Sequence, residues 1–387
     1  MPLRSQRDSG LLVIDKPKGV TSHDVVAAVR SMLHIKRVGH AGTLDPMATG
    51  VLIVGFGHAT RLLNVIVGHD KTYEATIRLG MATTTDDAEG KPILGDSLSD
   101  CDAIDQATIE QTIHQHFIGA IDQVPSTYSA IKIDGKRAYD LARQGMDVKL
   151  QARPIMVSAF DVLDMRHVFG VIPRLGSQSL PSTISGTASN IVFRADSVAE
   201  PQGAARARGS LIDLDVRITC SAGTYIRALG RDLGKELGVG GYLTALRRIR
   251  IGGCDVTAPT VIPARAVART YIDREGHEIT RNRAVFDCDA DELRSRSMPM
   301  LEAVKAVMPT IAITQEQAGD LRFGRRIAVR VETTTAAYVP SSGEVVALLE
   351  PVSSSTATSD AGGSAADVHT AISTTDVAKP AVVFPAD

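Results

Sequence analysis

An aspartate on a glycine-rich turn is the first candidate for chemistry in this sequence. Asp45 lies in GHAGTLDPMATGVL, residues 39–52, which continues into an apolar run at 51–54. Pro46 restricts the aspartate to an extended backbone, and the glycines at 39 and 42 permit a positive φ or the close approach of another segment. An Asp before a Pro is most often a structural turn residue. The turn therefore fits either a structural role or a carboxylate whose side chain projects from a shaped turn and is available for chemistry.

Two further side chains, Arg227 and Tyr73, also stand out. Arg227 falls in the first turn of a predicted helix, where a cation opposes the helix dipole at a cost of about 0.3–1 kcal/mol. Its helical neighbours include no carboxylate, so a buried Arg227 needs a partner from elsewhere, and Asp45 is eligible. Alternatively, Arg227 is not buried and forms an exposed stripe of arginines with Arg231 on the surface of the helix. Tyr73 lies on the apolar face of its strand, where a buried phenol needs a hydrogen-bond partner. It is either a core tyrosine or a tyrosine in a substrate pocket.

Two short apolar runs and two segments of alternating apolar and polar residues predict the strands that position these side chains. The predicted strands cover residues 11–14, 51–55, 71–79 and 212–220. A helix is expected to begin near His23, with Thr21 and Ser22 as caps. A second helix, with apolar residues at 226, 229, 233 and 237, is expected to follow caps at Gly223 and Thr224. The last hundred residues are expected to form a smaller unit, with a helix near 291–306 and short strands near 326–331, 344–350 and 381–384.

Charge is distributed in blocks that the net charge of -2 conceals. Residues 81–123 hold nine Asp or Glu against Lys91 alone, which predicts a solvated loop and helix. Residues 123–154 hold six Lys or Arg against three Asp, with two tyrosines interleaved. This basic segment is either a solvated surface or an arm that touches a phosphate backbone.

Composition narrows the class of protein. The four cysteines form no CxxC pair and stand at no metal-ligand spacing, which predicts free thiols in a reducing compartment. The N-terminus has no apolar signal segment, and no apolar run approaches the ~20 residues that span a bilayer. We therefore expect a cytoplasmic protein that does not enter membranes. Residues 166–210 and 352–376 have little periodicity and are expected to be disordered.

Five motifs, in order along the chain, together resemble the bacterial tRNA pseudouridine synthase B (TruB) family. They are DKPKG, GHAGTLDPMATGVL, KTYEATIRLG, QVPSTYSAIKIDGKRAYDLARQG and GTYIRALGRDLG. The resemblance covers roughly residues 10–165 and 210–260. It implies an α+β (mixed α/β) fold, with a mixed β-sheet and a central cleft. It also implies a catalytic domain at 10–260, which contains an RNA-binding arm at 123–154 and the insertion at 166–210. A connecting segment at 261–290 follows. The last domain, at 291–387, is a small β-rich RNA-binding domain of PUA type, interrupted by the 352–376 tract.

The resemblance also implies an activity and its residues. The family isomerises the uridine at position 55 in the tRNA T-loop to pseudouridine, without metal or cofactor, after flipping the base into a pocket. Asp45 resembles the catalytic aspartate, Arg227 the arginine that pairs with it, and Tyr73 the tyrosine under the base, a proposed general base. The residues implied to bind substrate are Lys16, His40, Lys136, Arg137, Tyr225 and Leu246, of which Leu246 is placed by the less secure alignment of the ALRR segment.

The implied partner is the tRNA T-arm, with no membrane and no obligatory protein partner, and the chain is expected to be a monomer. Two alternatives stay open at this point. One is a related synthase that acts on other RNA with a guide RNA, which the bacterial-type C-terminus and the continuous arm disfavour. The other is a tRNA-folding helper, a role that can coexist with catalysis.

Overall fold

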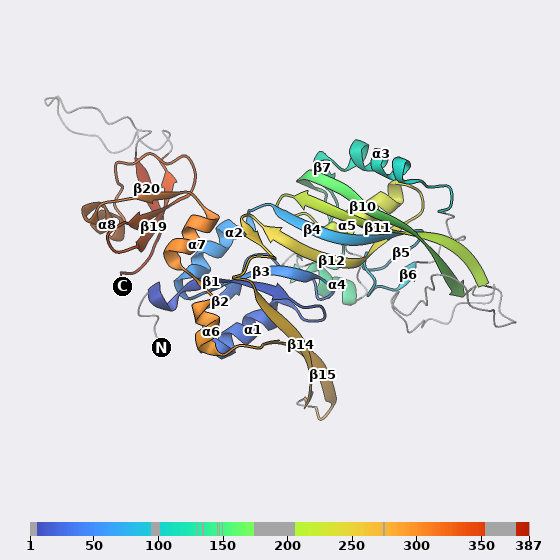
Figure 1. The fold of residues 1–387 in the computed structure, drawn as a ribbon, viewed down its shortest axis with the longest axis horizontal. Coiled ribbons are helices and arrows are strands. Elements are labelled where there is room, and N and C mark those ends of the chain that lie inside the picture. The colour runs from blue at the N-terminus through green and yellow to red at the C-terminus, as the bar shows by residue number, and fades with distance from the viewer. Residues whose placement is uncertain are drawn as a thin grey trace. The chain divides into compact units, whose positions relative to one another are not determined.

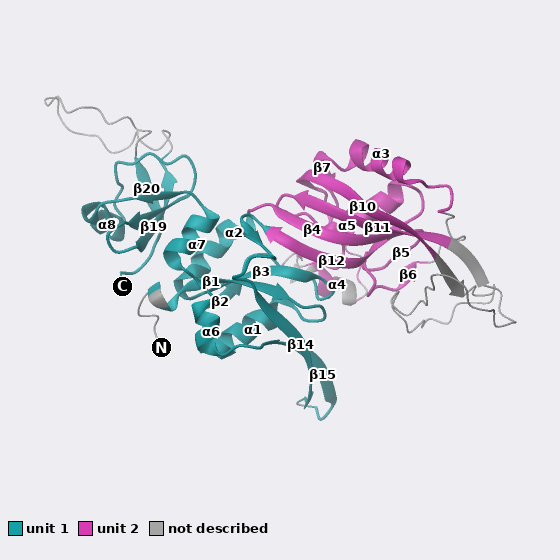
Figure 2. Cartoon of the chain, viewed as in Figure 1, with its two compact units in different colours: residues 1–68, 251–387 teal, residues 69–250 magenta. Residues whose placement is uncertain are grey.

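The computed structural model describes residues 6–93, 101–129, 131–133, 135–144, 146, 148, 150–173, 206–273, 275–352 and 377–386. The chain divides into two compact units, which Figure 2 colours teal and magenta. Unit 1 comprises residues 1–68 and 251–387, and unit 2 comprises residues 69–250. The chain thus leaves unit 1 after residue 68 and returns to it at residue 251. The predicted domain boundaries at 260 and 290 stay a prediction.

Unit 1 is built on a mixed set of strands in the order β15-β14-β1-β3 (Figure 1). β1 runs antiparallel to β3 and parallel to β14, which agrees with the predicted mixed sheet. The strands of this part are β1 (Gly10–Lys16), β2 (Val38–His40), β3 (Thr49–Phe56), β13 (Cys254–Asp255), β14 (Ile262–Ile272), β15 (Glu278–Phe286) and β16 (Met298–Pro299). Its helical segments are η1 (Gln6–Asp8), α1 (Ser22–Leu33), η2 (Gly57–Leu62), α2 (Leu63–Val67), α6 (Ala290–Ser295) and α7 (Met300–Val307).

Helix α1 forms where the sequence predicts it. Thr21 and Asp24 make a capping box, in which the Thr21 side chain accepts from the Asp24 amide and the Asp24 side chain accepts from the Thr21 amide. The apolar face of the helix, with Val25 and Val29, packs into a core with Leu12 of β1. Burying each such side chain stabilises the fold by about 1.5–3 kcal/mol. This packing fixes the turn at residues 17–21 that precedes the helix.

The C-terminal part of unit 1 holds a small sheet in the order β17-β18-β19-β20. Its elements are β17 (Thr310–Ala312), α8 (Gln315–Arg322), β18 (Thr335–Val339), β19 (Glu344–Pro351) and β20 (Ala378–Val383). Val345 and Phe384 belong to the same buried cluster as Leu11 of β1. The Gln6 side chain also donates to the Val345 and Pro385 carbonyls, at 2.8 and 3.0 Å. Because of this packing, the small sheet belongs to the same compact unit as the N-terminal residues.

Two predicted C-terminal elements were wrong. The helix expected near 291–306 is two helices, α6 and α7, because the chain between them extends to pair Met298 with Leu11 of β1. Pro299, which lacks an amide hydrogen, then precedes α7 as its N-cap. The strand expected at 326–331 is absent from the described residues, where Ile327 makes only an isolated bridge to Ala378. Residues 353–376, most of the predicted low-complexity tract, lie outside the described residues.

Unit 2 carries strands in the order β12-β4-β11-β10-β7. Its strands are β4 (Lys71–Leu79), β5 (Ala82–Thr83), β6 (Pro92–Ile93), β7 (Gly119–Gln123), β8 (Lys132–Ile133), β9 (Lys136–Arg137), β10 (Arg153–Pro173), β11 (Arg206–Cys220) and β12 (Gly241–Ile251). Its helices are α3 (Gln106–His116), α4 (Ala138–Arg143) and α5 (Ile226–Glu236). As predicted for β4, Tyr73, Ala75, Ile77 and Leu79 are buried.

Helix α5 lies close against its own unit because two of its residues are glycines. A Cβ added at Gly230 would lie 3.1 Å from the Leu243 side chain, and one added at Gly234 would lie 2.2 Å from the backbone at Gly240. A side chain at position 234 would push the helix away, and one at position 230 would require the Leu243 side chain to shift. The two glycines therefore set where the first turn of α5, with Arg227, is held.

The insertion predicted to be disordered at 166–210 is shorter than expected. β10 and β11 continue as an antiparallel pair as far as Pro173 opposite Arg206. The prediction was wrong for residues 166–173 and 206–210, because pairing with a partner strand supplies order that local composition does not show. Residues 174–205 lie outside the described residues. Among the described residues, no helix is both long enough and apolar enough to cross a membrane.

Candidate active site

The Asp45 turn of unit 1 connects two strands that pair with each other. Gly39 of β2 lies opposite Gly55 of β3, and the half-buried Asp45 sits in the loop between these strands. Gly42 has φ +92°, a conformation that favours glycine. A Cβ at Gly39 would lie 3.0 Å from the Leu63 side chain. As expected, one glycine of the motif, Gly42, has a positive φ, and the other, Gly39, allows the close approach of another segment.

Hydrogen bonds fix this loop on both sides of Asp45. The Ser22 hydroxyl donates to the Leu44 carbonyl at 3.1 Å and accepts from the Leu44 amide at 2.8 Å. The Gly19 amide donates to the Pro46 carbonyl at 2.7 Å. Both neighbours of the aspartate are therefore bonded to the turn that enters α1.

Lys16 joins the same arrangement from the end of β1. Its side chain is fully buried, and its Nζ donates to the carbonyls of Pro17 and Val20 at 2.9 and 2.8 Å. The Pro46 carbonyl lies 3.5 Å from the same Nζ. The ammonium group is thus a support for the turn beside Asp45. His40, the last residue of β2, is half-buried opposite Val54.

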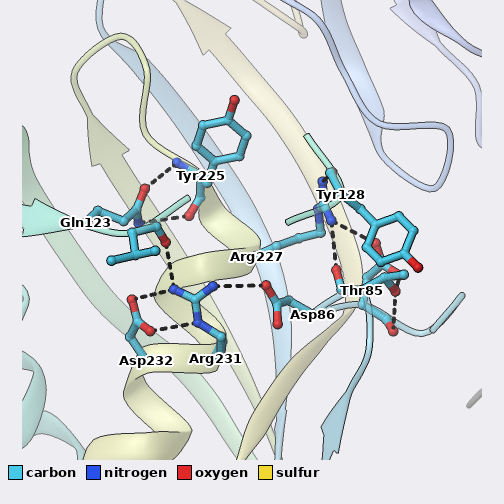
Figure 3. A network of polar contacts seen from close by, with 10 residues as sticks. Thr85, Asp86, Gln123, Tyr128, Tyr225, Arg227, Arg231 and Asp232 are labelled. Atoms are coloured by element: carbon cyan, nitrogen blue, oxygen red, sulfur yellow. Dashed lines mark hydrogen bonds and ion pairs between the residues drawn. The ribbon is translucent and has the colours of Figure 1, made fainter. Parts of the chain in front are cut away.

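Arg227 lies in the first turn of α5 in unit 2, as predicted, and its side chain is only 4% exposed. This burial excludes the exposed arginine stripe. Its guanidinium donates to the carbonyl oxygens of Thr85 and Tyr128 at 2.7 and 2.8 Å (Figure 3). The Asp87 carboxylate lies 3.5 Å from it as an ion-pair partner. These partners come from segments distant in the sequence, as expected for a buried Arg227 that has no carboxylate among its neighbours on the helix.

Asp87 is a further candidate residue, which its sequence context did not single out. It is 5% exposed, and its Oδ1 accepts from the Thr85 hydroxyl at 2.5 Å and the Glu89 amide at 3.0 Å. Its other oxygen, Oδ2, faces Arg227. The acidic segment 81–123 was interpreted as solvated, and at Asp87 that interpretation was wrong. The available signal was the TTTDDAEG run, whose Thr, Asp and Gly residues are typical of a hydrogen-bonded turn.

Arg231, one turn further along α5, has its own acidic partners. It bonds Asp232 at 2.8 Å and Asp86 at 3.2 Å, and it donates to the Val124 carbonyl at 2.7 Å (Figure 3). Burial alone would lower the pKa of Arg231, but the hydrogen bond with Asp232 and the charge of Asp86 raise it on balance. Asp86 has φ +59°, uncommon for a residue other than glycine. The loop therefore turns sharply to give one carboxylate to each arginine.

Two hydrogen bonds between the Gln123 side-chain amide and the Tyr225 backbone hold the start of α5, and we call this arrangement the amide clamp. The Gln123 side chain accepts from the Tyr225 amide at 2.8 Å and donates to the Tyr225 carbonyl at 3.0 Å (Figure 3). Tyr225, not the predicted Thr224, is the N-cap residue, and it makes no side-chain cap bond. The Thr224 hydroxyl instead donates to the Ser221 carbonyl at 3.0 Å. Gln123 is a second residue that the sequence analysis missed.

The remaining predicted residues of unit 2 lie on its strands. Tyr73 on β4 is 7% exposed and lies opposite Ile218 of β11, and Leu246 on β12 is also buried. Lys136 and Arg137 form β9, which pairs with β8, and their side chains are outside the described residues. The predicted pair of Asp45 and Arg227 joins residues of different units and stays a prediction.

Comparisons with known proteins identify the family. Residues 30–173 match the N-terminal domain of the TruB family of pseudouridylate synthases. A tRNA pseudouridine synthase B from Bifidobacterium longum (strain DJO10A) is 47% identical, over 88% of this chain and 94% of that protein. The protein of the same name from Cutibacterium acnes is 40% identical, over 89% of this chain and 93% of its own length. The chain belongs to the TruB family of pseudouridine synthases.

Solved structures agree on the fold. The crystal structure of a Cbf5–Nop10–Gar1 complex matches with a TM-score of 0.54 at 23% identity, covering 91% of this chain and 80% of that one. An H/ACA RNP bound to a substrate RNA containing 2'-deoxyuridine matches with a TM-score of 0.54 at 22% identity, covering 92% and 82%. At these identities the likeness shows the fold alone. It supports the predicted mixed α/β pseudouridine-synthase fold with a separate small sheet.

Proposed function

We propose that this protein isomerises the uridine at position 55 in the T-loop of tRNA to pseudouridine. Family membership over nearly the whole chain carries the proposal, because the relatives that show it are named tRNA pseudouridine synthase B. The Asp45 loop supports it, since hydrogen bonds on both sides of the aspartate hold one carboxylate in place. A preorganised group of this kind loses little conformational freedom when it reacts.

In the proposed mechanism Asp45, Arg227 and Tyr73 act on a uridine flipped out of the loop. Asp45 attacks the sugar or assists departure of the base as the C1′–N1 bond breaks, which requires its ionised form. Arg227 favours that form, because a nearby opposite charge stabilises a carboxylate. The freed uracil rotates and C5 bonds to C1′, which displaces Asp45 wherever it had bonded to the sugar. The proton on C5 passes to a base, for which Tyr73 is the candidate, and N1 takes up a proton, so that the base is only isomerised. These steps need no metal and no cofactor.

The remaining family residues are proposed to bind and position the RNA. His40 contacts the RNA near the flipped nucleotide, Tyr225 contacts the substrate, and Leu246 lines the apolar pocket. Lys136 and Arg137, in the arm at 123–154, contact phosphates, which makes their contribution dependent on salt. Lys16 acts through the carbonyls that it bonds in the turn beside Asp45.

The wider organisation follows the same proposal. The catalytic part is residues 10–260, and residues 291–387 form a PUA-like RNA-binding part joined through 261–290. The protein acts as a cytoplasmic monomer on the tRNA T-arm, without an obligatory protein partner, and also assists tRNA folding. A guide-dependent synthase would instead need a second RNA to act.

Mapping of the modified nucleotide tests the substrate. A T-arm transcript, the same transcript with position 55 changed to cytidine, and an rRNA fragment of equal length are incubated with the protein alone. We expect pseudouridine at position 55 of the first RNA and none in the other two. Modification of the rRNA fragment at a comparable rate would overturn the proposed T-loop specificity.

A further inference from the structure

The hairpin formed by β14 and β15 carries its positive charge on one face. Residues directly opposite each other across an antiparallel pair share a face, and the faces alternate along each strand. Arg269 lies opposite Arg281, and Arg283 lies opposite Val267, two positions earlier along β14. By the same alternation Arg265 belongs to this face too. All four arginines of the two strands therefore point the same way. The other face carries alanine, threonine, asparagine, isoleucine, phenylalanine and glutamate.

Two of these arginines are already neutralised. Arg265 forms an ion pair with Asp287, and Arg283 lies 3.3 Å from Asp24 at the start of α1. Arg269 and Arg281 differ, because within the described part of the chain neither has a carboxylate partner, and both are exposed. Like charges directly opposite each other destabilise a hairpin. An external anion would offset this repulsion.

The next pair of residues on the arginine face of the hairpin also suits an anionic partner with aromatic bases. Tyr271 lies opposite Ile279 and is 37% exposed. An exposed aromatic ring can stack on a base or pack against a sugar. Rows on one face of a strand are about 7 Å apart, so an arginine row and an aromatic row lie side by side. This combination suits a nucleic-acid strand, with its phosphates on the arginines.

The hairpin is also joined to the segment that supports Asp45. The Asn282 side chain donates to the Gly19 carbonyl at 3.1 Å, and the Gly19 amide donates to the Pro46 carbonyl at 2.7 Å. From this base the hairpin extends beyond the rest of the unit 1 strands (Figure 1). An RNA held on the hairpin would thus be held by the same unit that holds the Asp45 loop.

We propose that the Arg269–Arg281 row of the β14–β15 hairpin binds the phosphodiester backbone of the tRNA substrate. This interaction surface lies outside the arm at 123–154 and outside the small C-terminal sheet. The proposal rests on the proposed function, because it takes tRNA as the RNA that this protein binds.

Salt-dependent binding of a full-length tRNA transcript to the full chain tests the proposal. The variant is R269Q/R281Q, which removes two charges from one row. The matched control is R265Q/D287N, which also changes two charged residues of this part but removes a pair that is already neutral. R269Q/R281Q should melt no lower than the wild type, and the control should melt close to it, because an exposed ion pair contributes little to stability.

We expect R269Q/R281Q to bind tRNA about five- to tenfold more weakly at low salt. The slope of log K against log salt should fall by about 1.5, because two phosphate contacts are lost. The control should keep the affinity and slope of the wild type. An unchanged slope in R269Q/R281Q would overturn the proposal while leaving the wild-type isomerisation intact.

Two other outcomes would also overturn it. If the substitutions spare tRNA binding but weaken binding of polyglutamate, the face serves an acidic polypeptide. If the wild type itself fails to bind tRNA, the proposed function fails with it, and that failure is visible without any variant.

Discussion

The guanidinium of Arg227 and the carboxylate of Asp87 form a buried ion pair with 3.5 Å between the charged atoms. Each partner is held in place by other bonds, Arg227 by two backbone carbonyls and Asp87 by the Thr85 hydroxyl and the Glu89 amide. A buried arginine in this setting cannot swing to a new position without leaving polar groups unsatisfied. The pair therefore fixes where Arg227 presents its charge.

Asp87→Asn should slow isomerisation much more than it weakens tRNA binding. Asparagine keeps an acceptor for Thr85 but removes the charge opposite Arg227. We expect the single-turnover rate at saturating tRNA to fall at least tenfold, and the free energy of unfolding to fall by about 1–3 kcal/mol. Rapid-quench kinetics and urea unfolding measure the two effects.

Asp232→Asn is the matched control for Asp87→Asn. It removes one carboxylate from the other arginine of α5, Arg231, which keeps Asp86 as a partner. We expect a rate within about twofold of the wild type. Equal losses of rate in the two variants would show that the acidic residues around α5 act only on stability.

Gln123→Glu should loosen the start of α5. The carboxylate can still accept from the Tyr225 amide but cannot donate to the Tyr225 carbonyl, so two acceptors face each other. The Tyr225 carbonyl still accepts from the Leu229 amide at 3.2 Å, so the loss of the second hydrogen bond lowers the free energy of unfolding by about 0.5–1.5 kcal/mol. Amide hydrogen exchange should become faster in the first turn of the helix. Protection equal to that of the wild type would contradict the clamp.

Lys16→Met should release the turn beside Asp45 while keeping the volume of the side chain. The carbonyls of Pro17 and Val20 then lose their donor, and the Gly19 amide, which bonds Pro46, should exchange faster with solvent. We expect a lower single-turnover rate with little change in tRNA affinity. A loss of affinity with an unchanged rate would instead place Lys16 in direct contact with RNA.

Lys71 gives the stability a dependence on alkaline pH. Burial, followed by the nearby charge of Arg248, lowers the pKa of Lys71 from 10.5 to about 8. Between these values the unfolded chain binds more protons than the native protein, so this group makes stability rise with pH. Below pH 8 both states carry the proton, and the contribution of Lys71 does not change.

Lys71→Met isolates that contribution. The free energy of unfolding of the variant minus that of the wild type should be constant at neutral pH. It should then shift in favour of the wild type as the pH rises from about 8 to 10.5. Urea unfolding at pH 7.0, 8.5 and 10.0 measures it. A difference independent of pH would mean that Lys71 titrates like an exposed lysine.

Local patterns predicted the elements that hold most of the family residues. Strict alternation placed Tyr73 on the buried face of β4, and the Thr21 cap located the start of α1. The i, i+3 and i+7 apolar spacing located α5 and put Arg227 in its first turn. Such elements are readable because their signal is repeated within a single segment.

The partners of these residues were not predictable in the same way. Asp87 reaches Arg227 because its loop bridges to Leu243, a contact with no local signature. Gln123 meets Tyr225 only once β7 is paired. The arginine face of the hairpin depends on the register of Arg269 with Arg281, which was hidden inside a predicted connecting segment. Long-range pairing decides each of these, and a single sequence does not display it.

The most direct test is tritium release from a tRNA transcript labelled at uracil C5, with the wild type and Asp45→Asn side by side. The substitution is nearly isosteric and removes the carboxylate that the proposed reaction needs. We predict release equivalent to one uridine in the T-loop by the wild type, and none by the variant although it still binds tRNA. Release by Asp45→Asn at the wild-type rate would show that the carboxylate does not take part in the reaction.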